Sequence, residues 1–304
     1  MKKLFIIGNG FDISHGLPTR YCDFQTYLKK EYPEASEDTF TVPEPFFMPD
    51  GEEKYNDNEV VGFLLRVITE AEGNDGNWCD LEKTLGELNF DDFFCNYFEE
   101  DENEWHNVYR NEDIAASING ATKLIKRYFS DWVNTISICG SPKPKFNNLI
   151  NPETDLFLNF NYTETLEKIY NAKNVYHIHG KQGGELIFGH GNDIDYYDDY
   201  MAKNIGSELY LSELQRSLRK DTEKALDYDE IKPLFNDLHL VEEIYSYGFS
   251  YSDVDMVYIK KICQSVSTDS IVWYLHSYDN SKADIVKSKI RACGFDGKFD
   301  VFSS

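Results

Sequence analysis

The sequence is poor in positive charge. It contains 30 Lys and Arg residues against 54 Asp and Glu residues, for a formal net charge of -24 and an isoelectric point near 4.6. Surfaces that bind nucleic acid need clustered Lys and Arg, and anionic membrane surfaces attract cations, so neither partner is expected. A small anionic ligand remains compatible, because it needs only local amides and one or two cations.

Cysteine motifs and long apolar segments are also lacking. The six cysteines are scattered and form no C-x-x-C pair or zinc-knuckle spacing, so we expect free thiols and no metal. The apolar segment 4–7 is too short for a signal peptide, and no run approaches the length of a membrane span. These absences predict a cytoplasmic protein.

The composition, by contrast, is that of a folded chain. With 304 residues, 41% of them hydrophobic and 15% aromatic, the protein can bury one large core or two modest ones. Strand-like and helix-like segments alternate, which predicts a Rossmann-like α/β fold with a mostly parallel sheet and helices on both faces. The expected strands are 3–7, 155–161, 174–179, 185–189, 240–248, 270–275 and 298–303, and the expected helical segments among the later strands are 163–170, 195–226, 252–267 and 279–292.

A different pattern separates the first strand from the others. A helix is expected to begin near Thr19 or Asp23, and residues 33–58 are predicted to form a loop or insertion. Three- and four-residue apolar spacing predicts further helices. They cover 60–71, 80–100 and 114–138, before 140–153 returns to the strands. The chain is therefore interpreted as one α/β domain over 1–304, with a mostly helical insertion over 20–150. The aromatic run 90–98 is interpreted as core or as an oligomer contact.

Glycines end the first expected strand, in the segment "IIGNGFDISHGLP". A dinucleotide fingerprint would need glycine where the chain has Ile13, so that motif is absent. Gly8 and Gly10 still permit a sharp turn, and the amides of 8–11 are expected to cradle a phosphate. The plainer alternative is an ordinary turn between strand and helix.

Polar residues end several other expected strands. Asn159 and Asn161 are expected on one face of their strand, and His177 and His179 on one face of the next. The segments 188–193 and 247–250 combine glycine with small polar residues. Because ligands bind at the carboxyl ends of parallel strands, four such ends predict a shared ligand crevice.

Together these segments resemble the AbiH family, named for abortive phage infection. The resemblance rests on "GNGFDISHGLPTRYCDF", "WCDLE", "NFNYTETLE", "HIHG", "FGHGND" and "YGFSYSDVD", which span nearly the whole chain. It implies a role in phage defence, with a phage-derived or protein trigger and a homo-oligomer as further expectations.

A second and more distant similarity, to sirtuin-like NAD hydrolases, implies a mechanism and a sirtuin-like domain. The spacing of Gly8, Gly10, Gly16, Leu17 and Pro18 is similar to the sirtuin NAD-binding loop, "NFNYT" implies a catalytic Asn161, and "HIHG" a catalytic His179. The implied nucleotide-binding residues are Gly8, Asn9, Gly10, Phe11, Asp12, His15, Gly16, Pro18, Arg20, Gly248 and Ser250.

The chain also departs from the sirtuin pattern. Asp12, Phe160 and Thr163 replace the Ser, Gln and Asp of that pattern, Arg20 comes one position early, and the four zinc-binding cysteines are absent. These differences count against acyl-lysine chemistry more than against NAD binding.

The function expected from this resemblance is an NAD glycohydrolase, with NAD as substrate and nicotinamide and ADP-ribose as products. Asn161 would position water and a ribose hydroxyl, His179 would act as general base, and Asp12 would stabilise the oxocarbenium-like ribose. Two alternatives stay open. One is a metal-dependent hydrolase or nuclease that uses His177 and His179, with ligands drawn from His190, Asp193, Asp80 and Glu82. The other is a non-catalytic sensor of NAD or ADP-ribose.

Overall fold

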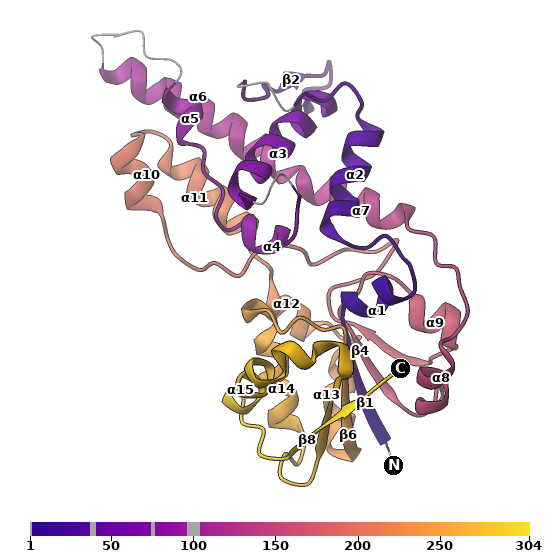
Figure 1. Ribbon diagram of the computed structural model, residues 1–304. Helices are drawn as coiled ribbons and strands as arrows, with labels where there is room; N and C mark the ends of the chain where they lie inside the picture. Colours follow the sequence, from indigo (N-terminus) through magenta and orange to yellow (C-terminus); the bar gives the residue numbers. More distant parts are fainter. Residues whose placement is uncertain (1, 37–40, 74–76, 96–103) are drawn as a thin grey trace. The chain divides into compact units, whose positions relative to one another are not determined.

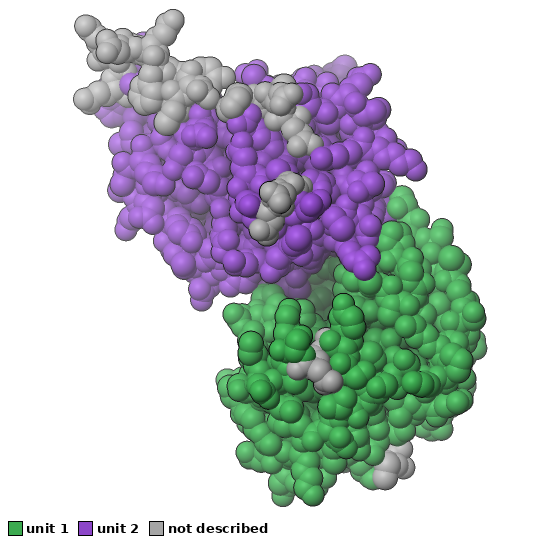
Figure 2. All heavy atoms as spheres, in the orientation of Figure 1, with its two compact units in different colours: residues 1–19, 133–187, 221–304 green, residues 20–132, 188–220 purple. Residues whose placement is uncertain are grey.

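The computed structural model describes residues 2–36, 41–73, 77–95 and 104–304 (Figure 1). The chain forms two compact units, coloured separately in Figure 2. Unit 1 comprises residues 1–19, 133–187 and 221–304, and unit 2 comprises 20–132 and 188–220. Unit 2 begins at Arg20, as the expected insertion at 20–150 does, but residues 133–150 belong to unit 1. The later segment 188–220 also belongs to unit 2.

Unit 1 is built on a six-stranded sheet in which every pair is parallel. The strands stand in the order β5-β4-β1-β6-β7-β8, which is the 3-2-1-4-5-6 order of doubly wound sheets. Their bounds are β1 Lys2–Ile7, β4 Leu156–Asn159, β5 Asn174–His177, β6 Val241–Tyr247, β7 Val272–His276 and β8 Lys298–Phe302. The Rossmann-like α/β fold predicted from the sequence is confirmed.

Helices cover both faces of this sheet. The central strands are buried on both sides, which is why β1 and β4 are continuous apolar runs and do not alternate. One apolar core joins β1, β4, β6 and β7 to α12, α13, α14 and α15, and the other joins the opposite side chains to α1, α8 and α9. The bounds are α1 Asn9–Ser14, α8 Pro144–Leu149, α9 Thr165–Tyr170, α12 Thr222–Asp227, α13 Lys232–Asp237, α14 Met256–Ser265 and α15 Ala283–Ala292, with short 3-10 turns η1 Leu238–Leu240, η2 Asp253–Asp255 and η3 Ser277–Lys282.

Unit 2 is mostly helical. Its apolar interior includes the buried rings of Phe24, Trp78 and Phe129, with Phe24 5.7 Å from Trp78 and 5.4 Å from Phe129 between ring centroids. Its helices are α2 Tyr21–Glu31, α3 Asp57–Glu72, α4 Leu81–Thr84, α5 Asp91–Cys95, α6 Glu104–Lys123, α7 Ile125–Thr135 (which runs on into unit 1), α10 Tyr197–Lys203 and α11 Glu208–Ser217, and its strands are the hairpin β2 Phe46–Phe47 and β3 Glu53–Lys54.

Several local predictions need correction. Residues 185–189 are not a strand: the amide of Ile187 donates to the carbonyl of His179, and the chain then leaves unit 1. The expected helix over 195–226 is three helices, interrupted at Gly206, whose φ of 99° no helix accommodates, and again after Ser217. The segment 140–153 contains the short helix α8, which Pro144 begins. The expected loop 33–58 holds the small β2–β3 hairpin. The expected helix over 80–100 is two short helices, α4 and α5, separated by 85–90, and residues 96–100 lie outside the described residues.

In the described part of the chain, no helix is both long enough and apolar enough to cross a membrane.

Candidate functional site at the carboxyl edge of the sheet

The strand ends of unit 1 lie in one row. Ile7, the last residue of β1, pairs with Asn159 on one side and with Tyr247 on the other, and Asn159 pairs in turn with His177. The segments that the sequence analysis singled out after 7, 159, 177 and 247 therefore leave the sheet side by side. This parallel register places these four strand ends at one edge of the sheet. The segment 188–193, which was expected at the same crevice, lies instead in unit 2.

The glycines of this edge bring two backbones into contact. A Cβ on Gly8 would lie 2.5 Å from the carbonyl oxygen of Gly248, and one on Gly10 would lie 2.7 Å from the Cα of Gly248. Gly248 itself has φ of 65°. The turns after β1 and β6 thus touch at positions that exclude any side chain.

Backbone hydrogen bonds hold the same contact. The amides of Gly8 and Gly10 donate to the carbonyls of Tyr247 and Gly248, each at 3.0 Å, and the amide of Phe11 donates to Gly8 at 2.9 Å. Three of the four amides expected to cradle a phosphate are therefore engaged within the protein. The glycine pattern is explained here by close packing of the backbone.

Asp12 follows this contact in helix α1, and its carboxylate is buried, with only 1% of the residue exposed. Its Oδ2 accepts a hydrogen bond from the hydroxyl of Thr163, which also lies 3.0 Å from the hydroxyl of Thr165. Its Oδ1 is buried with no hydrogen-bond partner. Burial raises the pKa of Asp12 to about 6, and the bonds with Thr163, Thr165 and Asn161 and the charge of His177 oppose that rise.

Asn161 joins β4 to the turn after β1. Its side-chain amide donates to the carbonyl of Gly8 at 3.2 Å, and its backbone amide donates to Oδ1 of Asn159 at 3.0 Å. Asn159 in turn donates to the carbonyl of Thr163. Both asparagines thus shape the loop that carries Thr163 to Asp12, and the Asn161 side chain opposes the rise in the pKa of Asp12.

His177 bridges this loop and helix α9. Its Nδ1 lies 3.0 Å from the carbonyl oxygen of Asn161 and its Nε2 lies 2.8 Å from Oε1 of Glu167. Both ring nitrogens therefore face oxygen atoms, one of the loop after β4 and one of helix α9. The second carboxylate oxygen of Glu167 is buried without a hydrogen-bond partner.

His179 lies among a different set of residues, and the expectation that it shares a face with His177 is wrong. Strand β5 ends at His177, so the alternation of side chains stops before His179 is reached. The His179 ring packs edge-on against Phe160 and Tyr258, with centroids 5.3 Å and 5.5 Å away. Its Nε2 lies 3.5 Å from Oδ1 of Asp255, and the side chain is 3% exposed.

The other residues implied to bind nucleotide fall into two groups. In unit 1, His15 spans the carbonyl of Phe11 and the hydroxyl of Tyr170, and Asn9 donates to the carbonyl of Thr19. Burial lowers the pKa of His15, in keeping with a neutral ring. Gly16, Pro18 and Ser250 are exposed. Arg20 is exposed and precedes α2 in unit 2, where its amide donates to the carboxylate of Asp23.

The additional residues considered for a metal site belong to unit 2. His190 is buried, with Nε2 2.9 Å from the carbonyl oxygen of Gln215 and Nδ1 accepting from the amide of Asn192 at 3.1 Å. Glu82 forms a 3.0 Å ion pair with the buried Lys220. Among the described residues, no group of three or more His, Cys, Asp or Glu side chains could hold a metal ion.

Sequence reasoning missed several members of the edge. Thr163 was noted only as a departure from the sirtuin pattern, yet its hydroxyl contacts Asp12. Thr165, Glu167 and Asp255 were given no role, although "NFNYTETLE" and "YSDVD" contain them. A signal was present, because a run of hydroxyl and carboxyl residues after a buried strand is unusual, but their partners depend on the fold.

These observations define a doubly wound α/β unit whose buried polar network lies at the carboxyl edge of its sheet, in a chain that also forms a mostly helical unit. The family described as bacteriophage abortive infection AbiH matches residues 4–277. The chain belongs to this family, as the resemblance of its motifs predicted. Searches of the curated proteins and of the solved structures found no match.

Proposed function

We propose that the chain acts in abortive infection as an NAD glycohydrolase, cleaving NAD to nicotinamide and ADP-ribose at the carboxyl edge of unit 1. The observation that carries the proposal is the carboxylate of Asp12, which is buried with one oxygen on Thr163 and the other without a partner. A buried charged oxygen without a partner is costly, and such groups concentrate at functional sites.

The location of Asp12 supports a nucleotide as the ligand. It follows β1, the central strand of a 3-2-1-4-5-6 sheet, where doubly wound proteins bind nucleotides near the switch in strand order. In this proposal the glycines serve the backbone contact between the turns, and the nucleotide is recognised by side chains. The amides of 8–11 are therefore not assigned to phosphate binding, because three of them already donate to backbone carbonyls and helix α1 has only six residues.

The chemistry follows from where charge develops. Breaking the bond between nicotinamide and ribose leaves positive charge on the ribose, which a nearby carboxylate stabilises. Asp12 is assigned this role, or the binding of a ribose hydroxyl through its second oxygen. Asn161 is assigned to position the ribose and water, and His179, oriented by Asp255, is assigned as general base.

The test measures NAD and nicotinamide by mass spectrometry. Purified protein is incubated with NAD, and cells that express it are sampled after phage infection, because the cellular arm supplies any trigger. We expect nicotinamide release by the wild type and its loss in Asp12→Asn and Asn161→Ala.

The matched control is Asp155→Asn. Asp155 is also a buried carboxylate of unit 1, but it accepts from the amides of Lys3 and Asn151 at the opposite edge of the same sheet. This variant should keep NAD cleavage if it folds. Unchanged NAD in both arms would refute the hydrolase, and thermal stabilisation by NAD without turnover would favour the sensor. Turnover that persists in both Asp12→Asn and Asn161→Ala would refute the residue assignment.

A further inference from the structure

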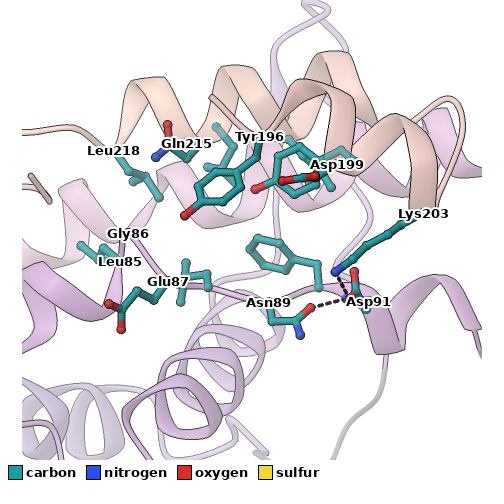
Figure 3. Close-up of a pocket in the computed structure, with 15 residues that line it drawn as sticks. Leu85, Gly86, Glu87, Asn89, Asp91, Tyr196, Asp199, Lys203, Gln215 and Leu218 are labelled. Atoms are coloured by element: carbon teal, nitrogen blue, oxygen red, sulfur yellow. Dashed lines mark hydrogen bonds and ion pairs between the residues drawn. The ribbon is translucent and has the colours of Figure 1, made fainter. Parts of the chain in front are cut away.

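Unit 2 contains a cavity of about 510 Å³ that the proposed NAD site does not use (Figure 3). It lies between the segment 85–91, which follows α4, and the helices α10 and α11. A volume of this size is typical of pockets for small organic ligands. Its apolar lining residues are Leu85, Leu88, Phe90, Leu211, Leu214 and Leu218.

Two motifs that carry the family resemblance frame this cavity. Trp78 of "WCDLE" is buried in unit 2, Asp80 caps α4 by accepting from the amide of Lys83, and α4 delivers the chain to the lining segment. Asn192 of "FGHGND" donates to the carbonyl of Gly86 at 2.7 Å and to the hydroxyl of Tyr196 at 3.0 Å. Asn192 therefore joins the segment 85–91 to the start of α10, and "WCDLE" lies in the chain just before that segment.

Buried contacts make this frame rigid. The Lys220 ammonium, 2% exposed, pairs with Glu82, and the Lys220 amide donates to the carbonyl of His190 at 2.9 Å. A Cβ on Gly86 would lie 2.9 Å from Asn192 and 3.0 Å from the His190 ring. A preformed wall of this kind lowers the ordering cost of binding a ligand.

The polar residues of the cavity make it negative. Its charged lining side chains are the acids Glu87, Asp91 and Asp199 and the base Lys203, so the lining carries more negative than positive charge. The Lys203 ammonium lies 2.7 Å from the carboxylate of Asp91 and so occupies one acid (Figure 3). Burial, followed by the charges of its neighbours, Asp91 and Asp199 among them, raises the pKa of Tyr200 to about 12, as expected of a phenol in a negative field.

Helix α10 forms one wall of the cavity and packs against α11. Tyr196, Asp199, Tyr200 and Lys203 line the cavity from the start and along one face of this seven-residue helix. Tyr196 accepts its bond from Asn192, so its own hydroxyl proton is not used in that contact. Aromatic faces beside carboxylates are the usual surroundings of a bound organic cation.

We propose that this cavity binds a monovalent organic cation with an apolar body, whose charge takes a place beside Asp199 and Asp91 while its body packs on the leucine floor. Lys203 is the internal competitor of that cation, because it already holds Asp91. The same chemistry is offered by a free amine and by an arginine or lysine side chain of a partner protein, and the binding assay separates these two sources.

The assay is calorimetric titration of the full chain with two pairs of probes. The free amine is 4-phenylbutylamine, with the neutral 4-phenylbutanol as its isostere. The peptide is acetyl-Phe-Arg-amide, with acetyl-Phe-citrulline-amide as its isostere. We expect at least one cation to bind in the millimolar range or tighter, its neutral partner to bind more weakly, and added salt to weaken the binding.

Three variants test the location. Asp199→Asn should weaken the cation by about two- to fivefold, the range of an exposed ion pair. Lys203→Met should strengthen it by about the same factor, because Asp91 is released. Asp198→Asn is the matched control: Asp198 is an exposed acid on the same helix that does not line the cavity, so its affinity should stay within about 1.5-fold of the wild type.

Four outcomes would overturn the proposal. They are no binding of either cation, equal binding of cation and neutral isostere, equal effects of Asp198→Asn and Asp199→Asn, and weaker binding to Lys203→Met. Because the assay measures binding in unit 2, its outcome is independent of NAD turnover. Stronger binding of the peptide than of the free amine would identify a basic protein segment as the source.

Discussion

The buried carboxylate of Asp12 should make the stability of unit 1 fall as the pH rises through the mildly acidic range. The pKa of this group is about 6 in the fold, against 3.8 for the ordinary side chain. Between those values the folded state holds a proton that the unfolded chain has released, so acid favours the folded state. Stability gained from this group is complete below pH 4 and is lost as the pH rises through 6.

The magnitude follows from the shift. Two pKa units correspond to about 3 kcal/mol, because each unit is worth about 1.4 kcal/mol. Asp12 therefore costs unit 1 about 3 kcal/mol at neutral pH relative to a carboxyl that titrates normally. Selection for stability alone would remove such a group, and its position beside Asn161 supports the proposed role in catalysis.

The assay compares wild type with Asp12→Asn at each pH between 4 and 8. Hydrogen exchange of peptides from β1, β4 and β6, read by mass spectrometry in low urea, reports the opening of unit 1 separately from unit 2. The difference in opening free energy cancels the other titrating groups that both proteins share. It should change by about 2.4 kcal/mol in favour of the wild type from pH 8 to pH 4, because the unfolded carboxyl is still mostly ionised at pH 4.

Asp155→Asn is again the control. Burial also raises the pKa of Asp155, but two backbone amides and the charge of Lys3 oppose that rise, so its pH dependence should be weaker. The account of Asp12 as a buried carboxyl with a raised pKa would be refuted if the difference in opening free energy between wild type and Asp12→Asn did not change with pH. It would also be refuted if that difference favoured the wild type at high pH.

Two further substitutions test the packing of each unit. Gly248→Ala should destabilise unit 1 by more than about 2 kcal/mol, because its Cβ would lie 2.5 Å from Gly10 and its φ is positive. The control Gly16→Ala, with a similar φ but open space around the new Cβ, should cost about 1 kcal/mol, and equal losses of stability by hydrogen exchange in the two variants would contradict the close-contact explanation. Lys220→Met should destabilise unit 2 by about 3–5 kcal/mol because it removes the buried cation that pairs with Glu82, and adding Glu82→Gln should restore much of this in thermal unfolding. A double variant no more stable than Lys220→Met would contradict the ion-pair account.

The fold was predictable from the sequence because its main signals are local. The apolar runs of β1 and β4 identify buried parallel strands, and the alternation of strands and helices predicts a doubly wound sheet. The segment 185–189 was misjudged for the same reason: it is apolar and short, but its direction is set by Gly189, whose φ is 154° and whose missing side chain admits the carbonyl of Leu218. No local pattern reports that contact.

The candidate site was predictable only in part, because side chains at strand ends depend on where each strand stops. The grouping of the four strand ends follows from parallel pairing, and the sequence could supply it. The separation of His177 from His179 could not be foreseen, since alternation predicts one face as long as the strand continues. The contact of Thr163 with Asp12 joins residues 151 positions apart, and no local pattern predicts it.

The distribution of the family motifs over two units has its own consequence for function. "GNGFD", "NFNYTETLE", "HIHG" and "YGFSYSDVD" lie in unit 1, whereas "WCDLE" and "FGHGND" lie in unit 2 and frame the acidic cavity. The motif residues named in unit 1 converge on the carboxylate of Asp12 and on the His179–Asp255 pair, and those in unit 2 on the walls of a pocket. A chain that only hydrolysed NAD would need the first set alone. The second set is expected of a protein that also binds a separate ligand, and we propose that this ligand is an organic cation bound in the cavity beside Asp199.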